Sequence, residues 1–261
     1  MPHISFSELK NWNFCPFYHK LVNIEKIKLF HGNEYTAFGT AVHEVCEKAA
    51  LNEISEAEYE ECFSKAFERE LSSLSDNDKL NEKLIDGMKM QGGGLLTDII
   101  PALGEYFGEY EVFSSEERLM EAIPSELGEK YDFKGYIDLV VRTKDGKYHI
   151  IDWKTCSWGW PAKKRSDPMI NYQLTLYKHF FGKKHQIKPE NIETHFGLLK
   201  RTAKNNKIEL FRVTSGPKKT KNALNLLHKA LYNIQDCNHV KNRLSCTTGY
   251  GCEYYKTEHC P

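Results

Sequence analysis

Two acidic residues and one lysine interrupt a segment whose pattern is otherwise that of a buried β-hairpin. Residues 135–155, GYIDLVVRTKDGKYHIIDWKT, contain two apolar runs separated by a polar turn at 144–146. Asp138 lies in the first run, Asp152 lies in the second, and Lys154 follows two residues later. Side chains alternate between the two faces of a strand, so Asp152 and Lys154 share a face, and Asp138 on the partner strand can lie close to both.

A divalent metal ion would explain why such a hairpin holds two carboxylates. A buried carboxylate is costly, and two together repel each other. Carboxylate oxygens are hard ligands that suit Mg²⁺ or Mn²⁺, which keep waters for a substrate phosphate and a nucleophile. Lys154 would then orient or deprotonate the attacking water, or neutralise the scissile phosphate. In the alternative, the hairpin lies at the surface with both aspartates solvated and Lys154 in a weak ion pair. D-x-K is short and common, so the hairpin alone leaves both interpretations open.

Two helical segments carry further polar residues that can join the hairpin. In 40–51, TAVHEVCEKAAL, His43 and Glu47 are four residues apart and therefore lie on one helical face. In 171–181, NYQLTLYKHFF, Gln173 and Tyr177 have the same spacing. Taken alone, His43 is more simply a core histidine, and the other two residues belong to an ordinary helix surface. Their occurrence together with the hairpin, in this order, is much harder to explain by chance.

The composition is that of a globular protein without a strong electrostatic field. The 261 residues are enough for one large domain or two small ones, and 40% of them are hydrophobic. The formal net charge is zero, so any nucleic-acid binding has to come from local basic patches. No segment approaches the roughly 18 apolar residues of a membrane span, and no apolar region typical of a signal peptide follows the start. We therefore expect a soluble, intracellular (cytoplasmic) protein with no membrane partner.

Helical and strand patterns follow one another in an order typical of an α/β or α+β fold. We expect helices from Ser5 or Ser7 onward and over 40–51, 55–75, 79–91, 95–110, 171–181 and 215–233. The triple glycine at 92–94 is expected to end the fourth of these helices. Strands are expected near 117–123, 134–142, 147–153, 193–200 and 207–213. This order favours one central mixed β-sheet flanked by helices.

The order of the motifs resembles that of a known family. The patterns G-x3-H at 39–43, G-x-I-D at 135–138, I-D-x-K-T at 151–155 and Q-L-x-x-Y at 173–177 are similar to those of PD-(D/E)xK nucleases of the RecB-like branch. That branch includes the RecB and AddB nuclease domains, CRISPR-adaptation nucleases and phage exonucleases. The resemblance extends from about Ser5 to Cys260. It implies a restriction-endonuclease-like α/β core, a single nuclease domain over 1–261 and DNA as the partner. The domain would consist of an N-terminal helical segment (1–33), the nuclease core (34–213), and a C-terminal helix and tail (214–261).

The resemblance also implies roles for the motif residues. His43, Asp138 and Asp152 would bind Mg²⁺ or Mn²⁺, and the main-chain carbonyl of Trp153 would complete the coordination. Lys154 would be the catalytic lysine. Gln173 and Tyr177 would support the active site and contact DNA. Two positions depart from the usual pattern: Ile137 replaces a proline before the first aspartate, and Cys156 stands where the branch often has glycine.

These roles imply a metal-dependent deoxyribonuclease, with exonuclease action on duplex ends or single strands, in recombination, repair or phage DNA metabolism. The chain has no Walker A motif and hence no helicase motor of its own, so a helicase or recombination protein is an expected partner. One alternative is a non-catalytic nucleic-acid-binding or assembly subunit that keeps the fold. Another is a nuclease that works only inside a recombination or CRISPR-adaptation complex.

Four cysteines near the two ends of the sequence form a candidate metal site. Cys246, Cys252 and Cys260 are spaced C-x5-C-x7-C, and Cys15 lies far upstream. Members of the branch often hold a [4Fe–4S] cluster with one cysteine before the core and three after it, although with a shorter tail spacing, near C-x2-C-x5-C. Such a cluster needs four thiolates. A structural Zn²⁺ on the same thiolates and free thiols are the alternatives. Cys237 and His239 are spare ligands, whereas Cys46, Cys62 and Cys156 are expected to be packing residues.

A basic, tryptophan-containing loop follows the catalytic motif. Trp158 and Trp160 precede Lys163, Lys164 and Arg165. Exposed tryptophans beside phosphate-binding charges suit single strands or frayed ends, where stacking contributes roughly 1–3 kcal/mol per base. We therefore predict a DNA contact here, and we interpret the basic residues at 200–204 and 218–221 as solvated surface.

Overall fold

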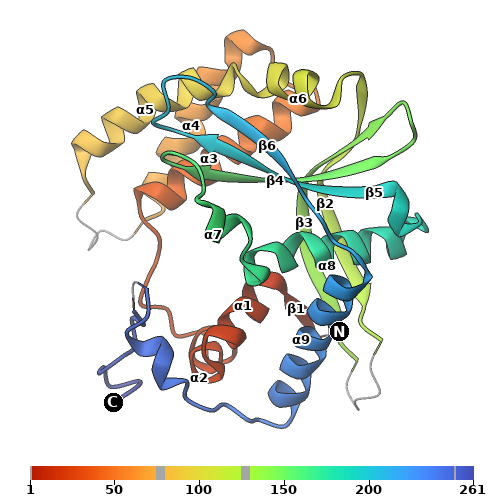
Figure 1. Ribbon diagram of the computed structural model, residues 1–261. Helices are drawn as coiled ribbons and strands as arrows, with labels where there is room; N and C mark the ends of the chain where they lie inside the picture. Colours follow the sequence, from red (N-terminus) through yellow and green to blue (C-terminus); the bar gives the residue numbers. More distant parts are fainter. Residues whose placement is uncertain (1, 75–79, 125–129, 250) are drawn as a thin grey trace. The chain divides into compact units, whose positions relative to one another are not determined.

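A mixed β-sheet is the central element of the fold (Figure 1). The computed structural model describes residues 2–74, 80–124, 130–249 and 251–261. Within them, the sheet has the order β1-β3-β4-β5-β6, with β2 paired to β3. Its strands are β1 (His3–Ser5), β2 (Tyr110–Ala122), β3 (Asp132–Thr143), β4 (Tyr148–Cys156), β5 (Ile192–Lys200) and β6 (Ile208–Val213). The predicted fold class, an α/β fold with a central mixed sheet flanked by helices, is confirmed.

The helices agree with most of the expected ranges. The α-helices are α1 (Phe6–Phe14), α2 (Pro16–His19), α3 (Glu34–Ala50), α4 (Tyr59–Ser72), α5 (Glu82–Leu96), α6 (Ile99–Phe107), α7 (Ala162–Arg165), α8 (Pro168–His185) and α9 (Pro217–Gln235). Short turns of other helix types are η1 (Lys20–Ile24), η2 (Glu56–Glu58), η3 (Pro189–Asn191) and η4 (Arg243–Cys246). The expected helices 55–75 and 79–91 each include one residue, Ser75 and Lys79, that lies outside the described part of the chain.

The chain divides into two compact units, each assembled from separate stretches of sequence. Unit 1 comprises Met1–His31, Leu119–Gly135 and Gly216–Pro261. Unit 2 comprises Gly32–Arg118 and Tyr136–Ser215. The predicted catalytic and metal-binding residues of the nuclease motifs all belong to unit 2, and the four predicted cluster cysteines all belong to unit 1. Assignment of the whole chain to a single nuclease domain stays a prediction.

In unit 2, the strand pairs fix which side chains share a face. Strands β3 and β4 form an antiparallel hairpin in which Leu139 lies opposite Ile151. Strands β4 and β5 are parallel, with Trp153 opposite Gly197, and β6 returns antiparallel to β5. Leu139, Ile151 and Trp153 belong to one hydrophobic cluster. By alternation, Asp152 and Lys154 point to the other side of β4.

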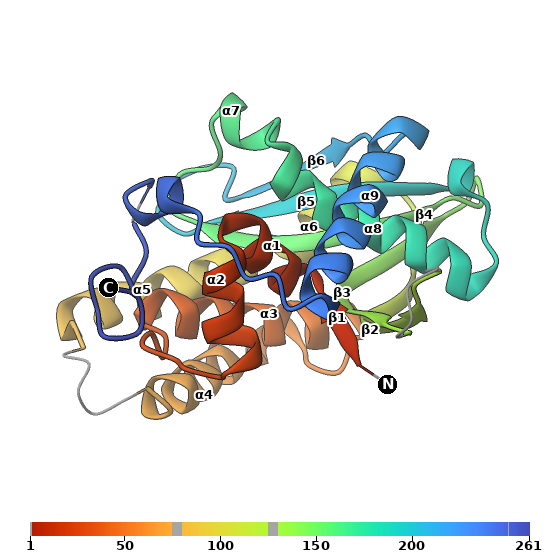
Figure 2. The same cartoon turned by 90° about the horizontal axis from the view of Figure 1, so that it is seen from below.

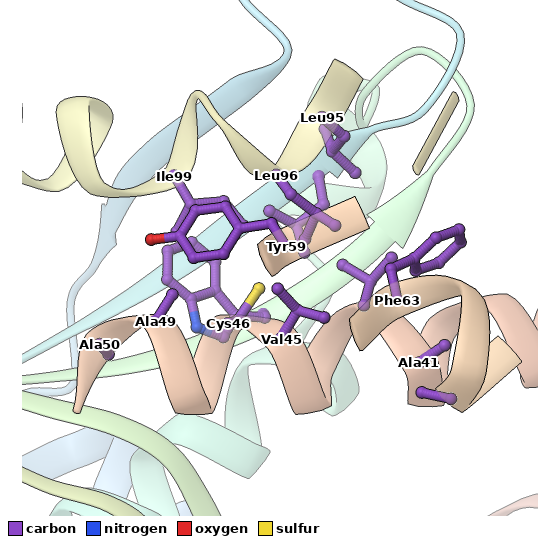
Figure 3. Close-up of a cluster of buried hydrophobic side chains, with 14 of the residues drawn as sticks. Ala41, Val45, Cys46, Ala49, Ala50, Tyr59, Phe63, Leu95, Leu96 and Ile99 are labelled. Carbon is purple, nitrogen blue, oxygen red and sulfur yellow. The ribbon is translucent and has the colours of Figure 1, made fainter. Parts of the chain in front are cut away.

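Helices α3, α4, α5 and α6 build the hydrophobic core of unit 2 on the Trp153 side of β4. Figure 3 shows Val45, Cys46 and Ala49 of α3 facing Leu96 and Ile99. Figure 2 shows α3 and α4 below the strands β4, β5 and β6. Helix α8 contacts β4 and β5 and buries a further set of residues, including Leu174, Tyr177 and Phe180. Two sets of helices therefore hold the hairpin strand that carries the predicted catalytic residues.

The triple glycine does not break a helix, contrary to expectation. Helix α5 continues through Gly92, Gly93 and Gly94 to Leu96. A Cβ on Gly92 would lie 2.2 Å from Cε1 of Phe63, so glycine allows α4 and α5 to approach closely at this point. The following helix is shorter than predicted, because α6 ends at Phe107 and residues 110–122 form a long strand.

In unit 1, the C-terminal tail is held against the N-terminal helices. Ser5 is the cap of α1, and its side chain accepts a hydrogen bond from the N–H of Glu8 at 3.2 Å. The carbonyl of Phe14 accepts hydrogen bonds from Asn242 Nδ2, at 2.9 Å, and from the Ser245 hydroxyl. The Tyr254 hydroxyl donates to the carbonyl of Ile27 at 2.6 Å. The predicted docking of a cysteine-rich tail on the N-terminal helices is thus present without regular secondary structure in most of the tail.

Candidate active site

Helix α3 and the β3–β4 hairpin bring three predicted metal ligands together. Asp138 Oδ2 accepts a hydrogen bond from the main-chain N–H of Trp153 at 2.7 Å. His43 Nδ1 lies 3.6 Å from the same oxygen. Asp152 is almost completely buried, with 1% of its surface exposed, and its Oδ2 lies 2.5 Å from Lys154 Nζ. The hairpin is therefore not a solvated surface hairpin: Asp152 is buried, and His43, Asp138 and Lys154 are partly buried around it.

Burial and mutual charge shift the protonation equilibria of the two aspartates in opposite directions. Burial, reinforced by the charge of Asp138, raises the pKa of Asp152 to about 6, although Lys154 and His43 oppose this shift. Burial also acts to raise the pKa of Asp138, but the hydrogen bond and charge of His43, together with Lys154, hold that pKa below its usual value. Asp138 therefore loses its proton more readily than an ordinary aspartate, and Asp152 loses its proton less readily.

The cationic partners of these carboxylates also have shifted pKa values. Burial alone would lower the pKa of Lys154, but the charges of Asp152 and Asp138 raise it above its ordinary value. Burial also acts against His43, and the hydrogen bond and charge of Asp138 raise its pKa above 6.5. Lys154 is consequently a cation at neutral pH.

The donor set fits a hard divalent cation. Asp152 Oδ2 is buried and receives no hydrogen bond of good geometry, despite its close contact with Lys154 Nζ, so it has lone pairs to offer a ligand. The N–H of Trp153 points toward Asp138, and the N–H and C=O of one strand residue point to the same side. This direction is compatible with the predicted role of the Trp153 carbonyl as a ligand.

A further acidic residue, the exposed Glu116, lies within electrostatic reach of this site and was missed in the sequence analysis. Burial raises its pKa, with contributions from Asp138 and Glu47, and His43 opposes the shift. Its neighbour Ser115 donates a hydrogen bond to the carbonyl of Asp138 at 3.0 Å. Glu116 has a φ of +46°, a left-handed conformation that is rare for a side chain of this type and that interrupts the alternation of β2. Alternation along the sequence could not reveal which of two consecutive glutamates faces the site.

Glu47, on the same face of α3 as His43, also lies in the field of the site. Burial raises its pKa, and Glu53, Glu44 and Asp138 add to the shift. The i, i+4 relation to His43 was visible in the sequence, but no role was assigned to this residue there. Its carboxylate extends the negative potential of the site along α3.

Helix α8 contributes the predicted glutamine and tyrosine. Gln173 Nε2 donates a hydrogen bond to the Tyr177 hydroxyl at 3.2 Å. Burial raises the pKa of Tyr177, and the charges of Asp152 and Asp138 add to the shift. The motif therefore lies within electrostatic reach of the two aspartates, as its predicted supporting role requires.

The two tryptophans of the basic loop differ in environment, and the expectation that both are exposed is wrong. Trp158 has 75% of its surface exposed, but Trp160 has only 8%. The Trp160 ring packs against Phe196 at 5.0 Å between centroids, and Lys164 Nζ lies 4.4 Å from the ring centroid. A base cannot stack on a ring that the protein itself covers, so Trp158 alone offers a free stacking surface.

The basic residues of this loop lie in and around α7. Arg165 makes an ion pair with Glu209 at 2.7 Å and donates to the carbonyl of Trp160 at 2.8 Å. It therefore anchors the loop to β6. Lys163 is exposed. The Trp160 ring and Arg165 shape the loop, while Trp158 and Lys163 face solvent.

The four predicted cluster cysteines line one cavity of about 220 Å³ in unit 1. Cys15 Sγ accepts a hydrogen bond from the N–H of Asn242 at 3.3 Å, and the N–H of Cys252 donates to the carbonyl of Cys246 at 3.1 Å. Burial raises the pKa of Cys252, and the charges of the other three cysteines add to the shift. The four cysteines that line this cavity supply the number of thiolates that a cluster or a zinc ion needs.

The remaining cysteines differ in exposure. Cys46 is buried in the core of unit 2, as expected for a packing residue, whereas Cys62 and Cys156 are partly exposed and Cys237 is exposed. In the described parts of the chain, none of the helices has the length and apolar character needed to cross a membrane.

The sequence profile of the PD-(D/E)XK nuclease superfamily matches residues 3–260, and the chain belongs to this superfamily. The crystal structure of the "Putative exonuclease" from Eubacterium rectale shares the fold, with a TM-score of 0.58 and 12% sequence identity over 94% of this chain and 86% of that one. The crystal structure of SSO0001 has 14% identity over 83% of this chain and 84% of that one, but a TM-score of only 0.35. Among curated proteins, none matches the chain.

Proposed function

We propose that the chain is a metal-dependent deoxyribonuclease that acts as an exonuclease on duplex ends or single strands. The observation that carries the proposal is the cluster of His43, Asp138 and Lys154, all partly buried, around the buried Asp152, held by α3 and the β3–β4 hairpin. A purely structural role would not favour two carboxylates of such low exposure on two adjacent core strands, because their mutual repulsion costs stability.

In the proposed site, His43, Asp138, Asp152 and the Trp153 carbonyl hold Mg²⁺ or Mn²⁺. The bound ion supplies a Lewis acid for the scissile phosphate and activates a water as the nucleophile. Lys154 remains a cation beside Asp152, which favours a role in neutralising the phosphate and positioning the water over a role as a base. Tyr177 and Gln173 support Asp152 from α8, and Trp158 offers a surface for an unpaired base.

The decisive experiment is a cleavage assay with Mn²⁺ on end-labelled linear and circular DNA, each as single and double strands. An exonuclease degrades the linear forms and leaves closed circles intact. Cleavage of circles would replace the exonuclease proposal by an endonuclease. An Asp152→Asn protein purified in parallel excludes a contaminating nuclease, because its preparation should be inactive. Binding of DNA without any cleavage by the unaltered protein would favour the alternative, a non-catalytic binding or assembly subunit.

We also propose that Cys15, Cys246, Cys252 and Cys260 hold a [4Fe–4S] cluster. The support is their convergence on one cavity in unit 1. Anaerobically purified protein should be brown, with a broad visible absorbance from sulfide-to-iron charge transfer, and should contain about four iron atoms per chain. Colourless protein with one equivalent of zinc would select the zinc alternative. Protein without either metal would leave only free thiols.

Recombination, repair and phage DNA metabolism are the proposed settings, with a helicase or recombination protein as partner. Residues 1–261 contain no nucleotide-binding P-loop, and the proposed partner would supply strand separation. A test is whether degradation of blunt duplexes rises when a helicase opens the ends. Equal rates on frayed and blunt ends would argue against dependence on such a partner.

A further inference from the structure

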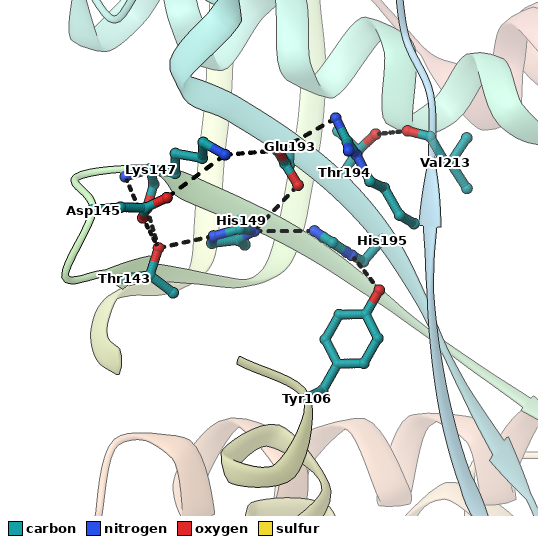
Figure 4. A network of polar contacts seen from close by, with 10 residues as sticks. Tyr106, Thr143, Asp145, Lys147, His149, Glu193, Thr194, His195 and Val213 are labelled. Carbon is teal, nitrogen blue, oxygen red and sulfur yellow. Dashed lines mark hydrogen bonds and ion pairs between the residues drawn. The ribbon is translucent and has the colours of Figure 1, made fainter. Parts of the chain in front are cut away.

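Two histidines and one glutamate form a second polar cluster in unit 2, at the beginning of strands β4 and β5 (Figure 4). His149 lies opposite Glu193 in the parallel pairing of the two strands, and His195 follows two residues after Glu193. His149 and Asp152 are an odd number of positions apart on β4, so they project from opposite faces. The cluster is therefore separate from the candidate active site.

The donor atoms of the cluster converge. His149 Nδ1 lies 3.1 Å from His195 Nε2 and 4.0 Å from Glu193 Oε2. All three ligand atoms lie within 4.8 Å of one another. Two nitrogens bound to one tetrahedral ion with bonds of about 2.0–2.1 Å would be separated by roughly 3.3 Å. The observed nitrogen separation is close to that value, so a small shift of the rings would admit an ion.

The hydrogen bonds of His149 identify its unprotonated nitrogen. The Thr143 hydroxyl donates its single hydrogen to the Asp145 carboxylate at 2.5 Å, because a carboxylate can only accept. The same hydroxyl lies 3.0 Å from His149 Nε2 and must therefore accept the hydrogen of that nitrogen. His149 Nδ1 consequently carries a lone pair, and that lone pair faces His195.

The other ring has a hydroxyl partner as well. His195 Nδ1 lies 3.4 Å from the Tyr106 hydroxyl. Without a metal, His195 Nε2 donates its hydrogen to His149 Nδ1, and Tyr106 donates to His195 Nδ1. With a metal, the hydrogen of His195 moves to Nδ1, where the Tyr106 oxygen accepts it, and the Nε2 lone pair becomes a ligand. Each ring would then have an outer hydroxyl contact of the kind that orients metal-binding histidines.

We propose that His149 Nδ1, His195 Nε2 and Glu193 Oε2 bind a divalent transition-metal ion, with Zn²⁺ as the ion that fits two imidazoles and one carboxylate. A cavity of about 530 Å³, lined among others by Tyr106, Asp145 and Arg212, adjoins the three ligands. It leaves room for a water as the fourth ligand and for the approach of the ion. The site would join β4 to β5 on the face opposite the nuclease residues.

The surrounding charges leave one carboxylate oxygen for the ion. Lys147 Nζ and Arg212 contact Glu193 Oε1 at 3.4 and 3.2 Å, whereas Oε2 faces His149. Asp145 pairs with Lys147 at 3.6 Å and offsets part of the local positive charge. Burial lowers the pKa of His149 and lowers that of His195 to about 3, so both rings are neutral at pH 7, as metal binding requires.

The test is calorimetric titration with Zn²⁺ of the full-length chain carrying Asp152→Asn, which weakens the separate nuclease site. The same protein with His195→Gln or Glu193→Gln added should bind one equivalent of Zn²⁺ less. His179→Gln, on α8, serves as the matched control and should leave the stoichiometry unchanged. Equal stoichiometry and affinity in all four proteins would overturn the proposal and leave a metal-free hydrogen-bonded histidine pair.

Two further measurements separate this site from the cysteines and from a loss of folding. Co²⁺ bound here should give weak visible absorption without the intense ultraviolet charge transfer of cobalt thiolates, and His195→Gln should remove only the weak bands.

Tyr106→Phe keeps the ring packing but removes the outer oxygen, and should weaken Zn²⁺ binding by about 10–100-fold. An unchanged affinity in Tyr106→Phe would contradict the assigned role of the hydroxyl. The melting temperatures of all variants, measured by circular dichroism in the presence of a chelator, should be alike. If His195→Gln melts at a lower temperature, the Zn²⁺ stoichiometry of Glu193→Gln decides whether the site exists. None of these outcomes depends on DNA cleavage.

Discussion

At the scale of single residues, the candidate active site depends on charges that stabilise one another only as a set. Asp152 is buried beside Lys154, and Asp138 is held between His43 and the N–H of Trp153. Alternation along two strands predicted that Asp138, Asp152 and Lys154 lie close together, whereas His43 was placed beside them by the family resemblance. Alternation was insufficient for Glu116, because a left-handed residue inside β2 changes which side chain faces the site.

Removal of the Lys154 side chain should abolish most of the catalytic activity and leave the fold intact. We expect Lys154→Ala to lower kcat by about 10²–10³-fold, the range for loss of one group that stabilises charge in the transition state. Single-turnover cleavage of end-labelled DNA measures this, and Lys218→Ala, an exposed lysine on α9, is the control. A Lys154→Ala protein that cleaves at the rate of the unaltered protein would remove this residue from the mechanism.

The affinity for metal should rise with pH. A proton competes with the ion for each ligand, so Mn²⁺ binding should strengthen as pH rises through the pKa of Asp152, about 6. It should continue to strengthen above 6.5, because Asp138 holds the pKa of His43 above that value. Electron paramagnetic resonance of free Mn²⁺ between pH 5 and 8 measures the effect. An affinity that is flat over this range would mean that neither group binds the ion.

Glu116→Gln should weaken Mn²⁺ binding by about tenfold, because a nearby charge acting across a partly solvated site contributes about 1.4 kcal/mol. Glu117→Gln is the matched control. Glu117 is the next residue in β2, but it pairs with His185 at 3.0 Å and with Lys184. Isothermal titration of both variants compares them directly. Equal effects of the two substitutions would show that Glu116 has no particular relation to the site.

At the scale of elements, the support of the site depends on close approaches that glycine permits. The sequence indicated most helices and all the strands of the hairpin, since periodicity and turn residues are local signals. It could not indicate that α5 continues through a triple glycine, because the reason lies in the Phe63 ring of another helix. The long β2 strand was likewise missed where the pattern favoured extension of the preceding helix.

Gly92→Ala should destabilise unit 2, since the added methyl group would collide with Phe63 at 2.2–2.8 Å. We expect a loss of about 1–3 kcal/mol in the free energy of unfolding, typical of overpacking. Gly104→Ala in α6 is the control: a Cβ there meets nothing within 4 Å, and alanine improves helix propensity by up to about 1 kcal/mol. Urea unfolding distinguishes them. A Gly92→Ala protein as stable as the original would show that the helices can separate without cost.

At the scale of the whole molecule, the two candidate sites lie in different units: unit 2 contains the candidate nuclease site, and unit 1 contains the cysteine cavity. The docking of the C-terminal tail on the N-terminal helix was predicted from the cysteines alone, because the tail has no hydrophobic periodicity that would indicate a helix or strand. Its hydrogen bonds to Phe14 and Ile27 could not be foreseen, since they join stretches far apart in sequence.

Loss of a cluster ligand should act on stability before activity. We expect Cys252→Ser to release the metal and to lower the free energy of unfolding by about 2–4 kcal/mol, as the loss of a long-range cross-link does. The rate of cleavage at 25 °C should stay close to that of the unaltered protein even though the melting temperature falls, because the four cysteines belong to a different unit from the nuclease residues. Exposed Cys237→Ser is the control. Unchanged melting after loss of the metal would contradict a stabilising role.

The composition of unit 1 from three separated stretches has a consequence for biosynthesis. Cys15 and strand β1 are made before the core of unit 2, and the residues that complete the cysteine cavity, up to Cys260, are made after it. The ribosome adds about 5–20 residues per second, so the first helices wait on the order of ten seconds for their partners. The core of unit 2 is complete in sequence by Ser215 and can form before then. Cofactor loading at the cysteines would therefore follow synthesis of the core of unit 2 and would require translation to have reached Cys260.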